Sequence, residues 1–369
     1  MNSRLAIAIF LSVLFTAALT FATLELPLAL SRVMIDVFGV PDYNQAIQPQ
    51  ALEEFMNSNY IRPIGYTCLA IILALVILGL VTKKTGLATL GSVAFFLPTF
   101  GSFVSYMFFL AGIGLLRVAW VPIWDPSKSL LRLGDVAYLP YAVVMYPLAL
   151  LSSLVNVDLS SPLGQLLSKN GMVRYYWGEF HPNLRTPVAY LILASGLMIF
   201  ALGTIAWLYA KLQGKRTVDF WIYRYSRHPQ YLGWLIWTYG VMLLASFAPV
   251  PRGGENPGAS LPWLISSLLI VCVAWLEEIE MRNRHPEEYA KHSEQTPFMF
   301  QVPARVRSAF ALPVRIVLRR EKPENGREVA LMFLVYAGIL ILLSLPFVLL
   351  YLPGSLGWTE FPYNVWPFT

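Results

Sequence analysis

The sequence predicts an all-α polytopic membrane protein, a transmembrane helical bundle of about nine spans, with eight as the alternative. Of its 369 residues, 57% are hydrophobic and only 13% are charged, whereas roughly a quarter of the residues in a soluble domain are charged. Apolar runs of about 20 residues recur along the chain, and each can cross a hydrocarbon core about 30 Å thick. Because lipid offers no partners to backbone amides and the runs do not alternate in polarity, we expect helices.

The first part of the chain predicts two spans and a long loop. The apolar run at 5–24 is longer than the 7–15 residues typical of a signal-peptide core, which favours a retained helix over a cleaved signal peptide. We expect a loop over 25–62 whose apolar beginning, 26–40, lies along the membrane interface. The second span is expected over 63–81.

Residues 86–120 are apolar, too long for one span and short for two, and Pro98 and Gly101 are spaced as in a turn. Basic residues concentrate in cytoplasmic loops. A tight hairpin here would place Lys128 and Arg132 on the cytoplasmic side together with the basic loop at 211–227, whereas a single helix would turn that loop outward. We therefore predict a hairpin.

The remaining spans are expected at 134–155, 186–209, 231–248, 261–276 and 329–352. A long outer loop at 156–185 and a short outer turn at 251–257 connect some of them, and 277–328 forms the largest cytoplasmic segment. The second half of that segment mixes arginines with apolar residues, which is typical of a helix lying on anionic lipid, although positive-inside anchoring explains the pattern equally well. These arginines are Arg305, Arg307, Arg315, Arg319 and Arg320.

Few residues are available for metal chemistry. Cys68 and Cys272 both fall within predicted spans, and they form no disulfide framework or zinc motif. The histidines are too few and too scattered for a membrane di-iron centre; they are His181, His228, His285 and His292. We expect neither a metal nor a nucleic-acid partner.

The densest group of reactive side chains is expected at one membrane boundary, where two consecutive spans begin and end. Pro229 suits the first turn of a helix, and the helix N-terminus with Arg227 and His228 would attract a carboxylate or phosphate. Acids at a helix C-terminus oppose the helix dipole, so Glu277 and Glu278 at the end of the next span indicate a function or a partner. Either motif alone could simply mark the interface; together they favour a site for a zwitterion.

These motifs resemble a known family. Arg-His-Pro-x-Tyr-x-Gly stands at 227–233, Glu-Glu at 277–278, Pro-Glu-Glu-Tyr-Ala-Lys-His at 286–292 and Thr-Pro-Phe at 296–298. The combination resembles the carboxy-terminal core of the isoprenylcysteine carboxyl methyltransferase and phospholipid methyltransferase superfamily, integral membrane enzymes that use S-adenosylmethionine.

The chain is expected to have three parts, of which the resemblance covers roughly 186–303. These are an N-terminal transmembrane bundle with outer loops over 1–185, a methyltransferase-like catalytic core over 186–303, and a basic interfacial segment with an additional C-terminal span over 304–369. Family members usually end soon after the Pro-Phe segment, so the additional span is expected to line an acceptor groove or to contact a protein partner.

The resemblance also implies roles for individual residues. Arg227 and His228 would hold the carboxylate of the cofactor, and Glu278, helped by Glu277, would hold its ammonium or ribose hydroxyls. The catalytic set is Arg227, His228, Glu277 and Glu278. The cofactor-binding set is His228, Pro229, Tyr231, Gly233, Glu277, Glu278, Tyr289 and His292, in which the tyrosines face the adenine or the sulfonium and Gly233 allows close approach of the cofactor or a neighbouring helix.

The expected function is transfer of a methyl group from S-adenosylmethionine to a lipophilic or small acceptor, in the plasma or inner membrane, with the site facing the cytoplasm. Ala274, Trp275 and Leu276 stand where the carboxyl methyltransferases typically carry an arginine, so a carboxylate, an amine and a thiol all stay open as acceptors. An NADPH-dependent lipid or steroid reductase and a non-catalytic subunit of a membrane complex are the alternatives.

Overall fold

The computed structural model describes residues 3–38, 61–82, 86–87, 90–91, 128–169, 172–176, 179–215, 217–247 and 259–350. These residues are mostly helical, and five helical stretches among them are long and apolar enough to cross a membrane, which confirms the predicted all-α membrane fold class. Most of the predicted hairpin at 86–120 and the whole turn at 251–257 lie outside the described residues.

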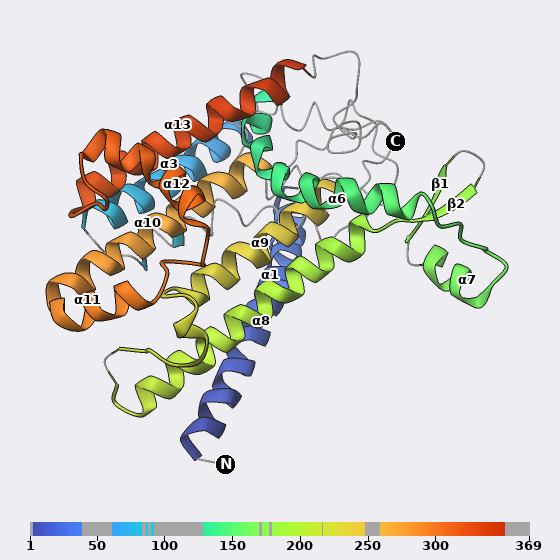
Figure 1. Cartoon of the computed structure of the whole chain (residues 1–369). Coiled ribbons are helices and arrows are strands. Elements are labelled where there is room, and N and C mark those ends of the chain that lie inside the picture. Colours follow the sequence, from blue (N-terminus) through green and yellow to red (C-terminus); the bar gives the residue numbers. More distant parts are fainter. Residues whose placement is uncertain are drawn as a thin grey trace.

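Helices α8 (Arg185–Leu212) and α9 (Pro229–Phe247) form the centre of the fold, close to the predicted spans at 186–209 and 231–248 (Figure 1). They run antiparallel and pack through glycines. A Cβ atom added at Gly240 would lie 2.7 Å from the amide nitrogen of Leu193, and one added at Gly233 would overlap the backbone of Phe200. Small residues of this kind let helix backbones approach closely within a membrane.

Helix α1 (Ser3–Phe38) lies against α8 (Figure 1). The Ser12 hydroxyl donates to the carbonyl of Ala201 at 3.0 Å, and the rings of Phe15 and Phe200 stack at 6.0 Å. The helix continues through 25–38, where a loop was predicted. This stretch is rich in good helix formers such as Leu, Ala and Met, so its lower hydrophobicity does not end the helix.

A second group consists of α3 (Ile61–Val81), α10 (Ser260–Arg284) and α13 (Gly326–Leu350). Their buried valines Val76, Val273 and Val329 belong to one apolar cluster. Helix α13 runs antiparallel to α10. Near the beginning of α13, the carbonyl of Val329 lies 3.9 Å from the thiol of Cys272 in the second half of α10. In the second half of α13, the hydroxyl of Ser344 accepts a hydrogen bond from the amide of Val136, in the segment that precedes α6.

The predicted span at 134–155 is two elements rather than one. A 3-10 helix, η3 (Lys128–Tyr138), is followed by α6 (Leu139–Ser152), which has Pro140 in its first turn. Proline favours the start of a helix because its missing amide hydrogen is not needed there. The stretch that hydrophobicity alone treats as one span is therefore a 3-10 helix followed by an α-helix.

The position of η3 contradicts one prediction about topology. Arg132 pairs with Asp135 at 3.0 Å, and Asp135 accepts a hydrogen bond at 2.6 Å from Ser260, the first residue of α10. Arg132 is thus at the end of α10 opposite to Glu278, with which Arg227 pairs. The placement of Arg132 on the same side as the loop at 211–227 was wrong, because it assumed an unbroken span after Arg132.

The predicted outer loop at 156–185 contains regular structure. It holds the short helix α7 (Pro162–Lys169) and an antiparallel hairpin of β1 (Val173–Tyr176) and β2 (Glu179–Pro182). His181 on β2 lies 3.0 Å from the carbonyl of Val155, which ties the hairpin to the chain that follows α6. Figure 1 shows this part projecting beyond the first residues of α8.

The predicted cytoplasmic segment at 277–328 is also largely helical. Helix α10 continues to Arg284, α11 covers Pro286–Gln295 and α12 covers Ala304–Leu318. The last predicted span, 329–352, corresponds to α13. These helices bring the ends of α9 and α10 together with α11, and that junction contains the predicted site.

Candidate functional site

The site is built where α9 begins and α10 approaches its end. Helix α9 starts at Pro229, as predicted. Just before it, the hydroxyl of Ser226 accepts a hydrogen bond from the backbone amide of His228 at 3.2 Å. A serine hydroxyl that accepts from the amide two residues later stabilises a turn, here the one that leads into α9. Ser226 was missed as part of the site, although serine is a common turn residue.

Helix α10 ends two turns later than predicted, and this corrects the argument from the helix dipole. Glu277 and Glu278 lie inside the helix, and its last turn carries Arg282 and Arg284. Arg284 also pairs with Glu280 at 2.5 Å. Because cations near a helix C-terminus complement the dipole, the conflict between the acids and the dipole is smaller than the sequence indicated.

Arg227 connects three segments of the chain. Its Nε donates to Glu278 at 2.6 Å, its Nη1 donates to the carbonyls of Ser293 and Thr296, each at 3.0 Å, and its backbone amide donates to the carbonyl of Pro297 at 3.0 Å. The side chain is 7% exposed. Arg227 therefore fastens the start of α9 to α10 and to the end of α11.

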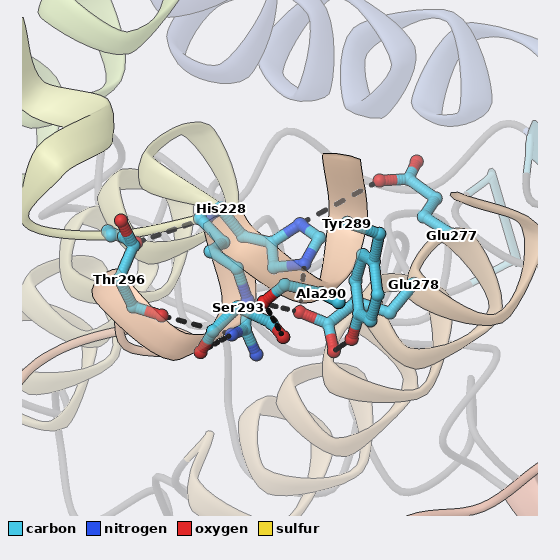
Figure 2. A network of polar contacts seen from close by, with 9 residues as sticks. His228, Glu277, Glu278, Tyr289, Ala290, Ser293 and Thr296 are labelled. Carbon is cyan, nitrogen blue, oxygen red and sulfur yellow. Dashed lines mark hydrogen bonds and ion pairs between the residues drawn. The ribbon is translucent and has the colours of Figure 1, made fainter. Parts of the chain in front are cut away.

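Glu278 is the buried centre of this network, with 9% of its side chain exposed. Besides Arg227, it faces Nε2 of His228 at 3.3 Å and accepts a hydrogen bond from the hydroxyl of Tyr289 at 2.7 Å (Figure 2). A buried charge is tolerated where it is paired and hydrogen-bonded. Three partners from two parts of the chain, the segment that leads into α9 and helix α11, thus hold this carboxylate.

Glu277 is the more open of the two carboxylates, with 38% of its side chain exposed. The hydroxyl of Tyr231 donates to its Oε1 at 2.5 Å, and its Oε2 lies 3.8 Å from Nδ1 of His228. Figure 2 shows the imidazole of His228 between Glu277 and Glu278, with a contact to each. The histidine and the acidic pair, 50 residues apart in sequence, are therefore neighbours.

Aromatic rings surround the imidazole. His228 stacks on Tyr231 at 5.8 Å and meets Phe298 edge-on at 5.2 Å. The guanidinium of Arg227 lies 6.0 Å from the ring centre of Tyr289 and 5.9 Å from that of Phe298, within the range of a cation–π contact. Phe298 came from the stretch that carried the family resemblance, but it was not predicted as a site residue.

Two groups on α11 have shifted pKa values. Burial, followed by the charge of Glu278, raises the pKa of the Tyr289 hydroxyl, so this residue remains a hydrogen-bond donor at alkaline pH. Burial, followed by the charge of Arg227, lowers the pKa of His292, which favours its neutral form. His292 thus lies within electrostatic range of the network.

Gly233 is placed differently from the other predicted site residues. Its Cα faces the backbone of α8 at Phe200, where a Cβ atom would not fit. The sequence suggested that Gly233 allows close approach either of the cofactor or of a neighbouring helix, and the structure shows the neighbouring helix. Pro229 is buried in the first turn of α9.

Part of the chain matches a known protein family. Residues 181–250 match the model of the isoprenylcysteine carboxyl methyltransferase (ICMT) family. The match spans α8, α9 and the Arg-His-Pro motif, and it confirms the family resemblance predicted from the sequence; Glu277 and Glu278 lie beyond it. The chain matches no curated protein and no solved structure. The match and the apolar helices support an integral membrane methyltransferase in general.

Proposed function

We propose that this protein transfers the methyl group of S-adenosylmethionine to a lipophilic or small acceptor. The observation that carries the proposal is the imidazole of His228 held between Glu277 and Glu278 at the end of a bundle of apolar helices. This arrangement begins within the segment that matches a methyltransferase family.

The charges of the site fit this cofactor. S-adenosylmethionine carries an ammonium, a carboxylate and a sulfonium. Glu277 is open enough to accept a hydrogen bond from an ammonium or a ribose hydroxyl. The faces of Tyr231 and Phe298 beside His228 offer π-systems to a cation, an interaction that contributes about 0.5–2 kcal/mol.

The geometry supports a division of roles that differs from the one expected from the family. We assign Glu277, His228 and Tyr231 to contact with the cofactor, because they form the more open side of the network. We assign Arg227, Glu278 and Tyr289 to positioning, because their polar atoms already bond to one another or to backbone carbonyls.

The protein's part in the reaction would be orientation and exclusion of water. S-adenosylmethionine supplies an electrophilic methyl group when bound. The aromatic wall and the apolar helices would keep water away from that group, which strengthens the fixed charges of the site. The buried network would hold His228 and Glu277 in one geometry, so that the acceptor meets the methyl group in line. The acceptor could enter laterally between helices.

Orientation in the membrane follows from the same proposal. The cofactor is a cytoplasmic metabolite, and the basic loop at 211–227 adjoins the site. We therefore place the site on the cytoplasmic side of the plasma or inner membrane.

Cofactor binding by the purified full-length protein tests the proposal. In lipid nanodiscs, S-adenosylmethionine should bind and raise the thermal unfolding temperature, and NADPH should do neither. Stabilisation by NADPH alone would replace the methyltransferase by a reductase. Binding of neither cofactor would favour a non-catalytic subunit.

A further inference from the structure

Helix α12 has one face packed against the protein and another that nothing covers in the described part of the chain. Val314 is 2% exposed, and Tyr336 of α13 donates its hydroxyl to the carbonyl of Phe310, so α12 is held against α13. On the side that faces away, Phe310 is 65% exposed and Ile316 is 67% exposed. Large apolar side chains form an open strip along this helix.

Cations border this apolar strip, and the helix itself carries no acid. Residues 304–320 contain five arginines and no Asp or Glu. Arg315 pairs with Glu321 and Arg320 with Glu324, both in the segment that follows the helix, and Arg320 also pairs with Glu328 in the first turn of α13. Arg305 and Arg307, at the start of α12, are exposed, and among the described residues no carboxylate forms an ion pair with them.

The short connection to α13 determines where α12 lies relative to the membrane. Only residues 319–325 separate α12 from α13, which is long and apolar enough to cross a membrane. Within this connection, the carbonyl of Pro323 accepts a hydrogen bond at 3.3 Å from Arg282 of α10. Helix α12 is therefore at the membrane boundary, at the end of the bundle that holds His228 and Glu278.

We propose that α12 is a docking surface for anionic phospholipids of the leaflet next to the site. An apolar strip bordered by arginines matches the level where acyl chains meet phosphates, and each cation near such a surface contributes about a five-fold preference for anionic lipid. A second copy of α12 would bring like charges together. This proposal does not depend on the methyltransferase reaction.

The depth of α12 can be measured on the full-length protein in nanodiscs. With Cys68→Ser as background and Cys272 left in place because it is buried, a nitroxide is attached at Ile316→Cys or, on the polar face, at Ser308→Cys. The label at 316 should be more accessible to oxygen and less accessible to a water-soluble nickel complex than the label at 308. Equal access of nickel to both would overturn the proposal.

The lipid charge is tested by comparing phosphatidylcholine nanodiscs with and without phosphatidylglycerol. Phosphatidylglycerol should be enriched around the wild type and should deepen the label at 316. The double variant Arg305→Gln, Arg307→Gln should lower the preference for phosphatidylglycerol about 30-fold, at about 1 kcal/mol per cation. The matched double variant Arg305→Lys, Arg307→Lys keeps both charges and should retain this preference.

Two other results would count against the proposal. If the lysine pair behaves like the glutamine pair, the guanidiniums serve a contact within the protein. If the label at 316 is shielded from both oxygen and nickel and cross-links to a second copy, the face is a protein interface.

Discussion

Glu277 and Glu278 are neighbours in the sequence but have different surroundings in the fold. Successive side chains on a helix point about 100° apart. Glu278 therefore faces Arg227 and Tyr289, and Glu277 faces Tyr231 and the more open side. The Glu-Glu motif predicted that both matter, but only the positions of the partners distinguish a carboxylate that holds the network from one that is open to a ligand.

This difference predicts separable effects of two matched substitutions. Glu277→Gln should weaken S-adenosylmethionine binding by about 1.5–3 kcal/mol, the scale of a hydrogen bond to a charged group, and leave thermal stability unchanged. Glu278→Gln should lower stability, because Arg227 loses its buried charged partner, and should weaken binding only indirectly, through the position of His228. Calorimetric titration and thermal unfolding measure the two effects. Unchanged affinity of Glu277→Gln, or unchanged stability of Glu278→Gln, would contradict the role assigned to that residue.

His292 predicts a pH dependence of stability. Burial and Arg227 lower its pKa below about 6.5, the ordinary value for histidine. As the pH falls below that value, the unfolded chain binds a proton that the folded chain does not, so the free energy of unfolding decreases. Thermal unfolding at pH 7 and at lower pH should show a smaller loss of stability for His292→Gln than for the wild type. An identical loss in both would exclude this histidine as the cause.

At the scale of elements, the packing of α8 on α9 sets the position of the Arg-His-Pro motif. The glycines Gly196 and Gly203 on α8 and Gly233 and Gly240 on α9 are each seven residues apart, and all four face the partner helix. This spacing was visible in the sequence, but no partner could be assigned to it. A glycine in an apolar span has the same local pattern whether it meets lipid, a ligand or a neighbouring helix.

Gly233→Ala should therefore disrupt the helix pair. The added methyl group overlaps the backbone of Phe200, and overpacking of this kind costs about 1–3 kcal/mol. Gly338→Ala on α13 is the matched control, because nothing lies within 4 Å of its added Cβ atom, and it should be neutral or stabilising by up to about 1 kcal/mol. Thermal unfolding in detergent would compare the two. Equal stability of both variants would contradict the close packing at 233.

At the scale of the whole molecule, the structure separates two polar regions at opposite ends of α10. The network around Glu278 occupies one end, and Arg132, Asp135 and Ser260 occupy the other. The buried Asp135 carboxylate fixes η3 to the first residue of α10, and Gly134 permits this contact because a side chain there would overlap Leu261.

Because the two polar regions lie at opposite ends of α10, residues beside them should be labelled from opposite sides of the membrane. Tyr225 is 75% exposed beside the site, and Leu163 is 65% exposed on α7, beyond the other end. In intact cells, a membrane-impermeant maleimide should react with a cysteine at 163 but with one at 225 only after lysis. Reaction of both positions in intact cells would contradict the proposed orientation.

The sequence by itself determined the class of fold, the start of α9 at Pro229 and the family resemblance, because hydrophobicity, proline and short motifs act locally along the chain. It could not determine that Arg132 lies away from Arg227, that Gly233 meets Phe200, or that Glu278 is enclosed while Glu277 is open. These facts depend on which helices pack together and on which face of each helix turns toward its neighbour. Only the tertiary structure decides contacts between residues that are far apart in the chain.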